Sequence, residues 1–207
     1  MDRKKELEKI AKEIESCRRC PLWQQATRAV PGEGDPEAEI MFIAEAPGFW
    51  EDKKGKPFVG QAGKLLDNLF SSVVLNREGV FITNILKHRP PGNRDPFPSE
   101  IDSCRGWLDR QIAIIQPRII VTLGRFALKK FLPQAKITRL HGRSQIISFL
   151  GRRFLLFPLF HPATALRNGE ILRSLRRDFQ KIPSLLAMEE GERLRGQGKG
   201  EQLILSG

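Results

Sequence analysis

Long apolar segments are missing from this sequence of 207 residues. No run approaches the roughly 18 to 20 apolar residues that are needed to span a bilayer, so the sequence predicts no membrane helix. The N-terminal segment MDRKKELEKIAKEI is charged and has helical spacing, so it lacks the apolar core of a signal peptide. We expect a cytoplasmic protein that acts as a monomer and has no membrane partner.

Cysteine is scarce, with Cys17, Cys20 and Cys104 as its only occurrences. A disulfide framework is not expected in a reducing cytoplasm, where a Cys-x-x-Cys pair is more typical of metal or redox chemistry. His88 lies between this pair and Cys104 and could be a fourth ligand. Tetrahedral zinc accepts three cysteines and one histidine, and histidine replaces cysteine in some iron–sulfur centres. The spacing leaves both metals open, and three unrelated buried cysteines are the alternative.

Acidic residues are outnumbered, since 24 Asp and Glu face 35 Lys and Arg, for a formal net charge of +11. Such an excess favours a polyanionic partner, because neutralising phosphates releases their condensed counterions. A charge-rich surface without such a partner is the alternative. No basic amphipathic membrane helix is evident, so nucleic acid is the expected partner.

Buried strands alternate with helices along most of the chain. Continuous apolar strands of this kind are typical of a parallel sheet covered on both faces. We therefore predict an α/β fold, a three-layer α/β/α sandwich with a central, mainly parallel four-stranded sheet. Residues 1–188 are expected to form one domain, and the Gly-rich, charged residues 189–207 a flexible tail. Strands are predicted within 40–48, 80–86, 118–124 and 153–160, and helices within 3–15, 61–75, 98–115, 125–132 and 169–188.

Three details of this prediction are specific enough to be checked. Residues 30–39 read as a loop because of their Gly, Pro and acidic content. Residues 144–157 could pair as a hairpin around Gly151 and add an antiparallel piece. Ser99 is the expected N-cap of the helix at 98–115, and Pro183 is expected to interrupt the last helix.

Polar and glycine-rich loops follow the first, second and fourth predicted strands: EAPGFWED at 45–52, NILKHRPPGN at 84–93 and HPATALRN at 161–168. Ligands of parallel α/β sheets bind outside the carboxyl ends of the strands. Three loops at one edge of one sheet can form one pocket. This convergence predicts an active site.

The first loop offers the carboxylates of Glu45 and Glu51 and the aromatic face of Phe58. It matches neither a P-loop nor the dinucleotide fingerprint, and an ordinary turn-rich connection is the alternative. In the last loop, His161 is followed by Pro162, which restrains its backbone, although a lone histidine is more often structural. Leu166 is a candidate wedge between DNA bases, or it packs beneath its loop.

Taken together, these motifs resemble those of the thermostable iron–sulfur uracil-DNA glycosylases, family 4 of their superfamily. The resemblance runs from about Glu6 to Leu186. It rests on four pieces in the expected order: the Cys17–Cys20 pair, EAPGFWEDKKGKPFVGQAGKLLD, FITNILKHRPPGNRDPFPSEIDSCR and HPATALRN. It implies a uracil-DNA glycosylase-like fold, a 4Fe-4S cluster and excision of uracil from DNA, which leaves an abasic site.

The same resemblance implies roles for individual residues. Glu45 and Glu51 would shape and polarise the pocket, Asn84 would read the uracil edge, and His161 would hydrogen-bond a uracil carbonyl. Phe58 would stack on the flipped base. Further substrate contacts are expected from Ala46, Gly48, Asn93, Leu166 and Arg167, with Leu166 filling the space left in the duplex and Asn93 supporting the site.

Two residues depart from the family pattern. Ala44 replaces a glycine, a small change. His88 replaces the third cluster cysteine, and we interpret it as a ligand, so that Cys17, Cys20, His88 and Cys104 would hold the cluster, with zinc as the alternative. A related branch traps uracil-DNA covalently through a histidine in a basic insertion, and the loop RPPGNRDPFPSE has none. Hydrolytic turnover is thus expected. A covalent single-turnover binder and an inactive nucleic-acid-binding module with a structural cluster remain as alternatives.

Overall fold

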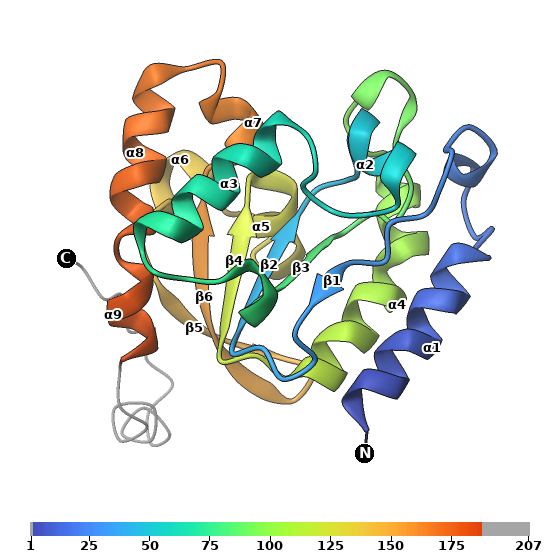
Figure 1. Cartoon of the computed structure of the whole chain (residues 1–207), viewed down its shortest axis with the longest axis horizontal. Coiled ribbons are helices and arrows are strands. Elements are labelled where there is room, and N and C mark those ends of the chain that lie inside the picture. Colours follow the sequence, from blue (N-terminus) through green and yellow to red (C-terminus); the bar gives the residue numbers. More distant parts are fainter. Residues whose placement is uncertain (1, 188–207) are drawn as a thin grey trace.

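The computed structural model describes residues 2–187, so the tail predicted at 189–207 lies outside the described residues. One six-stranded sheet in the order β1-β3-β2-β4-β6-β5 forms its centre (Figure 1). The strands β3, β2, β4 and β6 are mutually parallel, which confirms the predicted four-stranded parallel core. The bounds are β1 Glu33–Gly34, β2 Ile40–Ala44, β3 Phe81–Asn84, β4 Ile119–Leu123, β5 Gln145–Phe149 and β6 Arg152–Leu159.

Two antiparallel strands extend this core at its edges. The hairpin around Gly151 is confirmed, because β5 pairs antiparallel with β6. At the other edge the prediction of a loop at 30–39 was wrong for two residues, because Glu33 and Gly34 pair antiparallel with β3. A strand this short has no alternation of apolar residues, so its pairing comes from the neighbouring strand and not from its own sequence.

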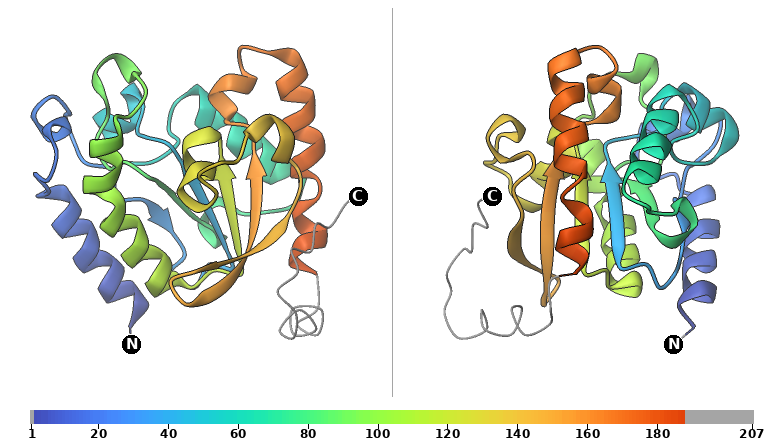
Figure 2. Two further views of the ribbon diagram at one scale, coloured as in Figure 1. Left: turned by 180° about the vertical axis from the view of Figure 1, so that it is seen from behind. Right: turned by 60° about the vertical axis from the view of Figure 1, so that its left-hand side comes forward.

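Helices cover both faces of the sheet. The strand β2 shows why, since Met41 and Ile43 face one apolar cluster while Ile40 and Phe42 face the other. Figure 2 shows α1 and α4 side by side on the first face, and α3 and α8 pack on the second. The helices are α1 Arg3–Glu15, α2 Phe49–Lys54, α3 Gln61–Ser72, α4 Pro98–Ile115, α5 Arg125–Phe131, α6 Ile137–Leu140, α7 Pro162–Ala165, α8 Gly169–Phe179 and α9 Ile182–Leu186, with 3-10 turns η1 Pro21–Gln24, η2 Arg77–Gly79 and η3 Pro91–Asn93.

Two helix boundaries are informative. The prediction that Ser99 caps α4 was wrong, because Phe97 is the N-cap and the Glu100 carboxylate accepts a hydrogen bond from the Phe97 backbone N–H at 2.8 Å. Pro98 is thus the first helical residue, a position where its missing N–H costs nothing. The expected break in the last helix is confirmed, since α8 ends at Phe179 and α9 begins at Ile182.

The parallel strands bring three loops to one edge of the sheet. In Figure 1 the arrows of β2, β4 and β6 point toward the end of the molecule where α2 and α7 lie. The loops after β2, β3 and β6 therefore meet there, as the sequence predicts. Between residues 2 and 187, none of the helices has the length and hydrophobicity of a membrane span.

Candidate active site

A cavity of about 700 Å³ opens at the carboxyl edge of the sheet. Its lining comes from the loops after β2, β3 and β6, together with the residues that follow β4. Of the predicted residues it contains Glu45, Ala46, Gly48, Glu51, Phe58, Asn84, Asn93, His161 and Arg167. Leu166 is not in the lining, and its exposed side chain follows α7 at the cavity rim, between the lining residues Thr164 and Arg167.

His161 presents a neutral imidazole to this cavity. Its Nδ1 accepts a hydrogen bond from the Ala163 backbone N–H at 3.0 Å, which also caps α7. The hydrogen of the neutral ring therefore lies on Nε2. Burial lowers the pKa of His161 to about 4, against a weaker opposing effect of the Glu51 carboxylate. At neutral pH this histidine is an uncharged N–H donor.

Asn84 ends β3 and is 2% exposed. Within residues 2–187 its side-chain amide makes no hydrogen bond, although Asn84 lines the cavity. The amide is open to the cavity, because the buried side-chain atom without a partner among residues 2–187 is Thr122 Oγ1 and not an atom of Asn84. A ligand in the cavity can therefore replace water as its hydrogen-bonding partner. Because one amide has both a donor and an acceptor group, Asn84 can bind a ligand edge that offers the complementary pair.

Glu45 is the most strongly perturbed carboxylate at the cavity. Burial and, to a smaller extent, nearby Asp95 raise its pKa to about 7, while Arg125 opposes the shift. Asp95 forms an ion pair with Arg125, and both residues line the cavity. A carboxylate that titrates near neutral pH is suited to general acid–base chemistry. Sequence reasoning missed both residues: Asp95 lies within the motif FITNILKHRPPGNRDPFPSEIDSCR but was given no role, and Arg125 was read only as the start of a helix.

Glu51 has a different role, which is to hold the loop that carries Phe58. Its Oε1 accepts hydrogen bonds from the backbone N–H groups of Val59 and Gly60, both at 2.9 Å. Phe58 itself has a positive φ of 51°, and its ring stacks against that of His161 with centroids 5.8 Å apart. Gly63 allows this conformation, because a Cβ at that position would lie 1.9 Å from the Phe58 carbonyl oxygen. Glu51 thus fixes an aromatic wall of the cavity.

Asn93 supports the cavity from the loop after β3. Its φ is 55°, and its side-chain oxygen accepts a hydrogen bond from Arg89 Nε at 2.6 Å. The neighbouring Arg94 binds Glu100 through both of its terminal nitrogens, at 2.9 and 2.6 Å. This bidentate pair ties the loop to the first turn of α4.

A fully buried lysine, also missed by sequence reasoning, connects this loop to the core. Lys87 Nζ donates to Thr83 Oγ1 at 2.6 Å, to Gln111 Oε1 at 2.8 Å and to the Asn84 carbonyl at 2.9 Å. Gln111 in turn donates to the Pro31 carbonyl at 2.8 Å. The available signal was a single lysine within the apolar stretch NILKH, because a charged residue is rarely fully buried without partners.

The three cysteines approach one another between α1 and α4. They form no disulfide, and Cys17 and Cys20 lie close enough to influence the pKa of Cys104, which burial raises to about 11. The indole N–H of Trp107 donates to Cys17 Sγ at 3.3 Å. His88 is 6% exposed, and burial lowers its pKa. In the described part of the chain, however, no three His, Cys, Asp or Glu side chains are arranged to hold a single metal ion. Thiolates are typical ligands of zinc and of iron–sulfur clusters. Among residues 2–187 the side chains are not already arranged around a single ion position.

The third histidine does not line this cavity, although it lies behind one of its walls. His141 Nδ1 is 2.6 Å from Asp178 Oδ2, and its ring packs on Phe160. It lines a separate, smaller cavity with Arg139, Arg143 and Lys181. Among the residues that line the first cavity, His161 is the only histidine.

Comparison with known proteins agrees with this geometry. The family model described as the uracil DNA glycosylase superfamily matches residues 31–182. The chain is 50% identical to a type-4 uracil-DNA glycosylase of Sulfurisphaera tokodaii, over 86% of this chain and 84% of that protein. It is 48% identical to the type-4 enzyme of Saccharolobus solfataricus, over 87% of each chain, and 43% identical to that of Archaeoglobus fulgidus, over 89% and 95%. The chain therefore belongs to the uracil-DNA glycosylase superfamily, and within it to the type-4 uracil-DNA glycosylases.

Proposed function

We propose that this chain excises uracil from DNA by hydrolysing the bond between the base and its deoxyribose, leaving an abasic site for repair. The observation that carries the proposal is that a neutral His161 N–H donor lines the same cavity as the Asn84 amide, which has no hydrogen bond within residues 2–187.

The reaction requires the nucleotide to leave the duplex, because a stacked and paired base is unreachable. In the cavity the Phe58 ring would stack on the uracil, and Asn84 would pair with its edge. As the glycosidic bond breaks, negative charge develops on uracil, and the Nε2–H of His161 would stabilise it. One preorganised donor of this kind contributes about 3 to 4 kcal/mol in other enzymes.

Glu45 is the proposed partner of the attacking water and of the positive charge on the sugar. Ala46 offers no carboxylate, whereas the raised pKa of Glu45 makes its ionised form a useful base near neutral pH. Glu51 is bound to backbone N–H groups, so we assign it a positioning role.

This assignment predicts a pH effect. The excision rate should rise with pH through about 7, as Glu45 ionises. Glu45→Gln should remove that rise and lower the rate at pH 8. Because the folded pKa lies above the unfolded one, the contribution of Glu45 to stability is full below about 4.5 and lost as the pH passes about 7. The melting temperature of Glu45→Gln should therefore exceed that of the wild type at pH 8 but not at pH 4, and equal differences at both values would contradict the assignment.

We further propose that Cys17, Cys20, Cys104 and His88 hold a 4Fe-4S cluster that stabilises the fold. Support comes from the gathered thiols and the Trp107 N–H donated to Cys17. A single zinc ion, which accepts three cysteines and one histidine, is the alternative to this cluster. Its chemistry would be structural, since none of the four residues lines the cavity.

Substituting one of the four proposed ligands should lower both the metal content and the thermal stability of the protein. We expect Cys17→Ala and His88→Ala to lose iron and to melt at lower temperature, since metal binding is coupled to folding. His88→Cys should keep the iron. Iron and zinc per chain, measured by mass spectrometry on anaerobically purified protein, and thermal melting are the readouts, with the adjacent Ser16→Ala as control. A His88→Ala protein with unchanged iron content and melting temperature would remove His88 from the ligand set.

The proposed function is tested with an end-labelled oligonucleotide that contains one uracil, analysed on denaturing gels. Strand scission that needs alkali indicates an abasic product and hence the hydrolytic enzyme. A slow band stable to denaturant would instead indicate covalent trapping, which the location of His141 does not favour. No product with metal present would indicate a binding module.

A further inference from the structure

Exposed aromatic side chains gather on one rim of the cavity. Among residues 2–187, three aromatic side chains are markedly exposed: Phe49 (44%), Trp50 (55%) and Phe97 (54%). Water-facing rings of this size are unusual, and when several adjoin a site they mark an interaction surface. All three flank residues of the cavity lining, since Gly48 and Glu51 bracket the first two and Arg94 contacts Phe97.

Phe49 and Trp50 lie outside the hydrophobic core and contact each other. Phe49 and Trp50 occupy the first turn of α2, with ring centroids 5.2 Å apart and planes inclined at 84°. Trp50 lies beside Gly60, where an added Cβ would be 3.4 Å from its Cδ1 atom. Gly60 is held by Glu51, the residue that also fixes the Phe58 wall. The two rings therefore lie on the same helix as Glu51, whose hydrogen bonds position the Phe58 wall of the cavity.

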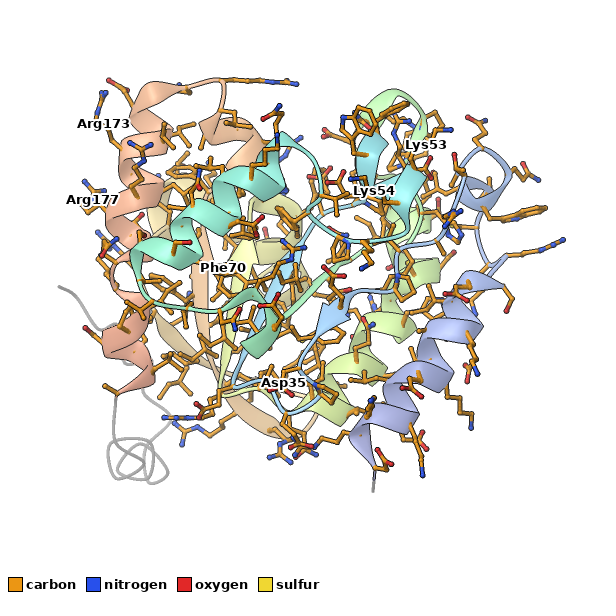
Figure 3. All side chains as sticks on the ribbon, in the orientation of Figure 1. Asp35, Lys53, Lys54, Phe70, Arg173 and Arg177 are labelled. Carbon is orange, nitrogen blue, oxygen red and sulfur yellow. The ribbon has the colours of Figure 1, made fainter. Side chains whose placement is uncertain are left out.

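Cations accompany the rings. The guanidinium of Arg89 lies 5.1 Å from the Phe49 ring centroid, and that of Arg94 lies 3.8 Å from the centroid of Phe97. Lys53 lies 5.9 Å from the Phe49 ring centroid, and Figure 3 shows Lys53 and Lys54 together on α2, while Arg173 and Arg177 lie on α8 at the other side of the view. Rings interleaved with Lys and Arg are the composition of surfaces that bind single-stranded nucleic acid, where bases stack and phosphates are neutralised.

We propose that Phe49, Trp50 and Phe97, with Arg89 and Arg94, form a stacking platform for the unpaired DNA bases next to the flipped uracil. The occupant follows from charge and continuity. Arg89 and Lys53 beside Phe49 make the platform positive, whereas Arg94 is paired with Glu100, and the platform adjoins the lining of the cavity. Only unpaired bases expose the ring faces that such side chains stack on. The proposal rests on the proposed function for the identity of the strand.

Binding of a non-cleavable strand tests the platform separately from catalysis. The probe is a fluorescein-labelled single-stranded oligonucleotide with one 2′-fluorodeoxyuridine, which resists hydrolysis because fluorine destabilises positive charge on the sugar. Two further probes carry an abasic tetrahydrofuran in place of the base 5′ or 3′ to the uracil, with all phosphates kept. We expect wild-type protein to bind one of these two roughly tenfold more weakly than the intact probe, the scale of one stacked base.

The double variant Phe49→Ala/Trp50→Ala should bind the intact probe equally weakly and should not respond to the abasic substitution. Leu150→Ala, which trims an exposed apolar side chain at the β5–β6 turn, should behave as the wild type, and thermal melts should show that all variants are folded. Equal binding of all three probes, or a double variant that still senses the missing base, would overturn the platform. The same probes annealed to a complementary strand complete the test. A double variant that is weakened only on these duplexes would overturn the platform in favour of a duplex wedge. Excision of ordinary uracil by the same wild-type preparation reports separately on the proposed function.

Discussion

His161→Ala should lower the single-turnover excision rate by a factor of about 100 to 1,000, the loss measured when one oxyanion donor is removed elsewhere. The reason is that His161 offers a neutral Nε2–H, fixed by the Ala163 N–H bound to Nδ1, in the cavity where we propose that negative charge develops on uracil. Its pKa of about 4 also predicts that the wild-type rate has no transition from this histidine near pH 6.5. Quenched-flow excision assays across pH 5 to 8 measure both effects.

His161 also caps α7, so the alanine variant alone could act through the fold. His161→Asn provides the control, since asparagine is a good N-cap. It should melt like the wild type and still lose most of the rate, because its shorter amide does not reach the imidazole Nε2 position. Full activity in His161→Asn would show that only the cap matters and would contradict the donor role.

Lys87→Met should lower the free energy of unfolding by about 3 kcal/mol. The substitution keeps a long apolar side chain but leaves Thr83 Oγ1, Gln111 Oε1 and the Asn84 carbonyl without their buried donor. Each buried acceptor left unpaired costs about 1 to 3 kcal/mol, and partial rearrangement offsets some of this. Urea unfolding followed by circular dichroism measures the change.

Lys64→Met is the matched control, since Lys64 is exposed on α3, where surface substitutions change stability by about 0.5 kcal/mol or less. Because Lys87 is bonded to the backbone of Asn84, its loss should also raise KM for uracil-DNA. Equal unfolding energies for Lys87→Met and Lys64→Met would mean that the network does not stabilise the fold.

The parallel core could be predicted because β2, β3, β4 and β6 are continuous apolar runs separated by helical segments. The edge strand at Glu33 and Gly34 could not, since two residues carry no periodicity. Ser99 was the wrong cap because Pro98 favours the first helical position and Glu100 binds back to Phe97. That choice depends on the geometry of one turn, which a pattern of residue types does not contain.

The cavity was predictable to the level of which loops meet, since parallel strands end at one edge. The roles of individual residues, however, depend on their three-dimensional surroundings, which the sequence pattern does not contain. Glu45 and Glu51 look alike in sequence, yet burial beside Asp95 raises the pKa of the first, while the second is bound to two backbone N–H groups. The Lys87 network joins residues from three segments far apart in the chain, and no local pattern reports such a contact.

The most direct test of the central claim is a count of free uracil molecules released per enzyme molecule from excess single-stranded DNA that contains one uracil per strand. Hydrolysis in the His161–Asn84 cavity predicts a count far above one that grows with time, with each uracil matched by one abasic site. A count that stops at one or below, with the protein folded and its metal present, would contradict the account.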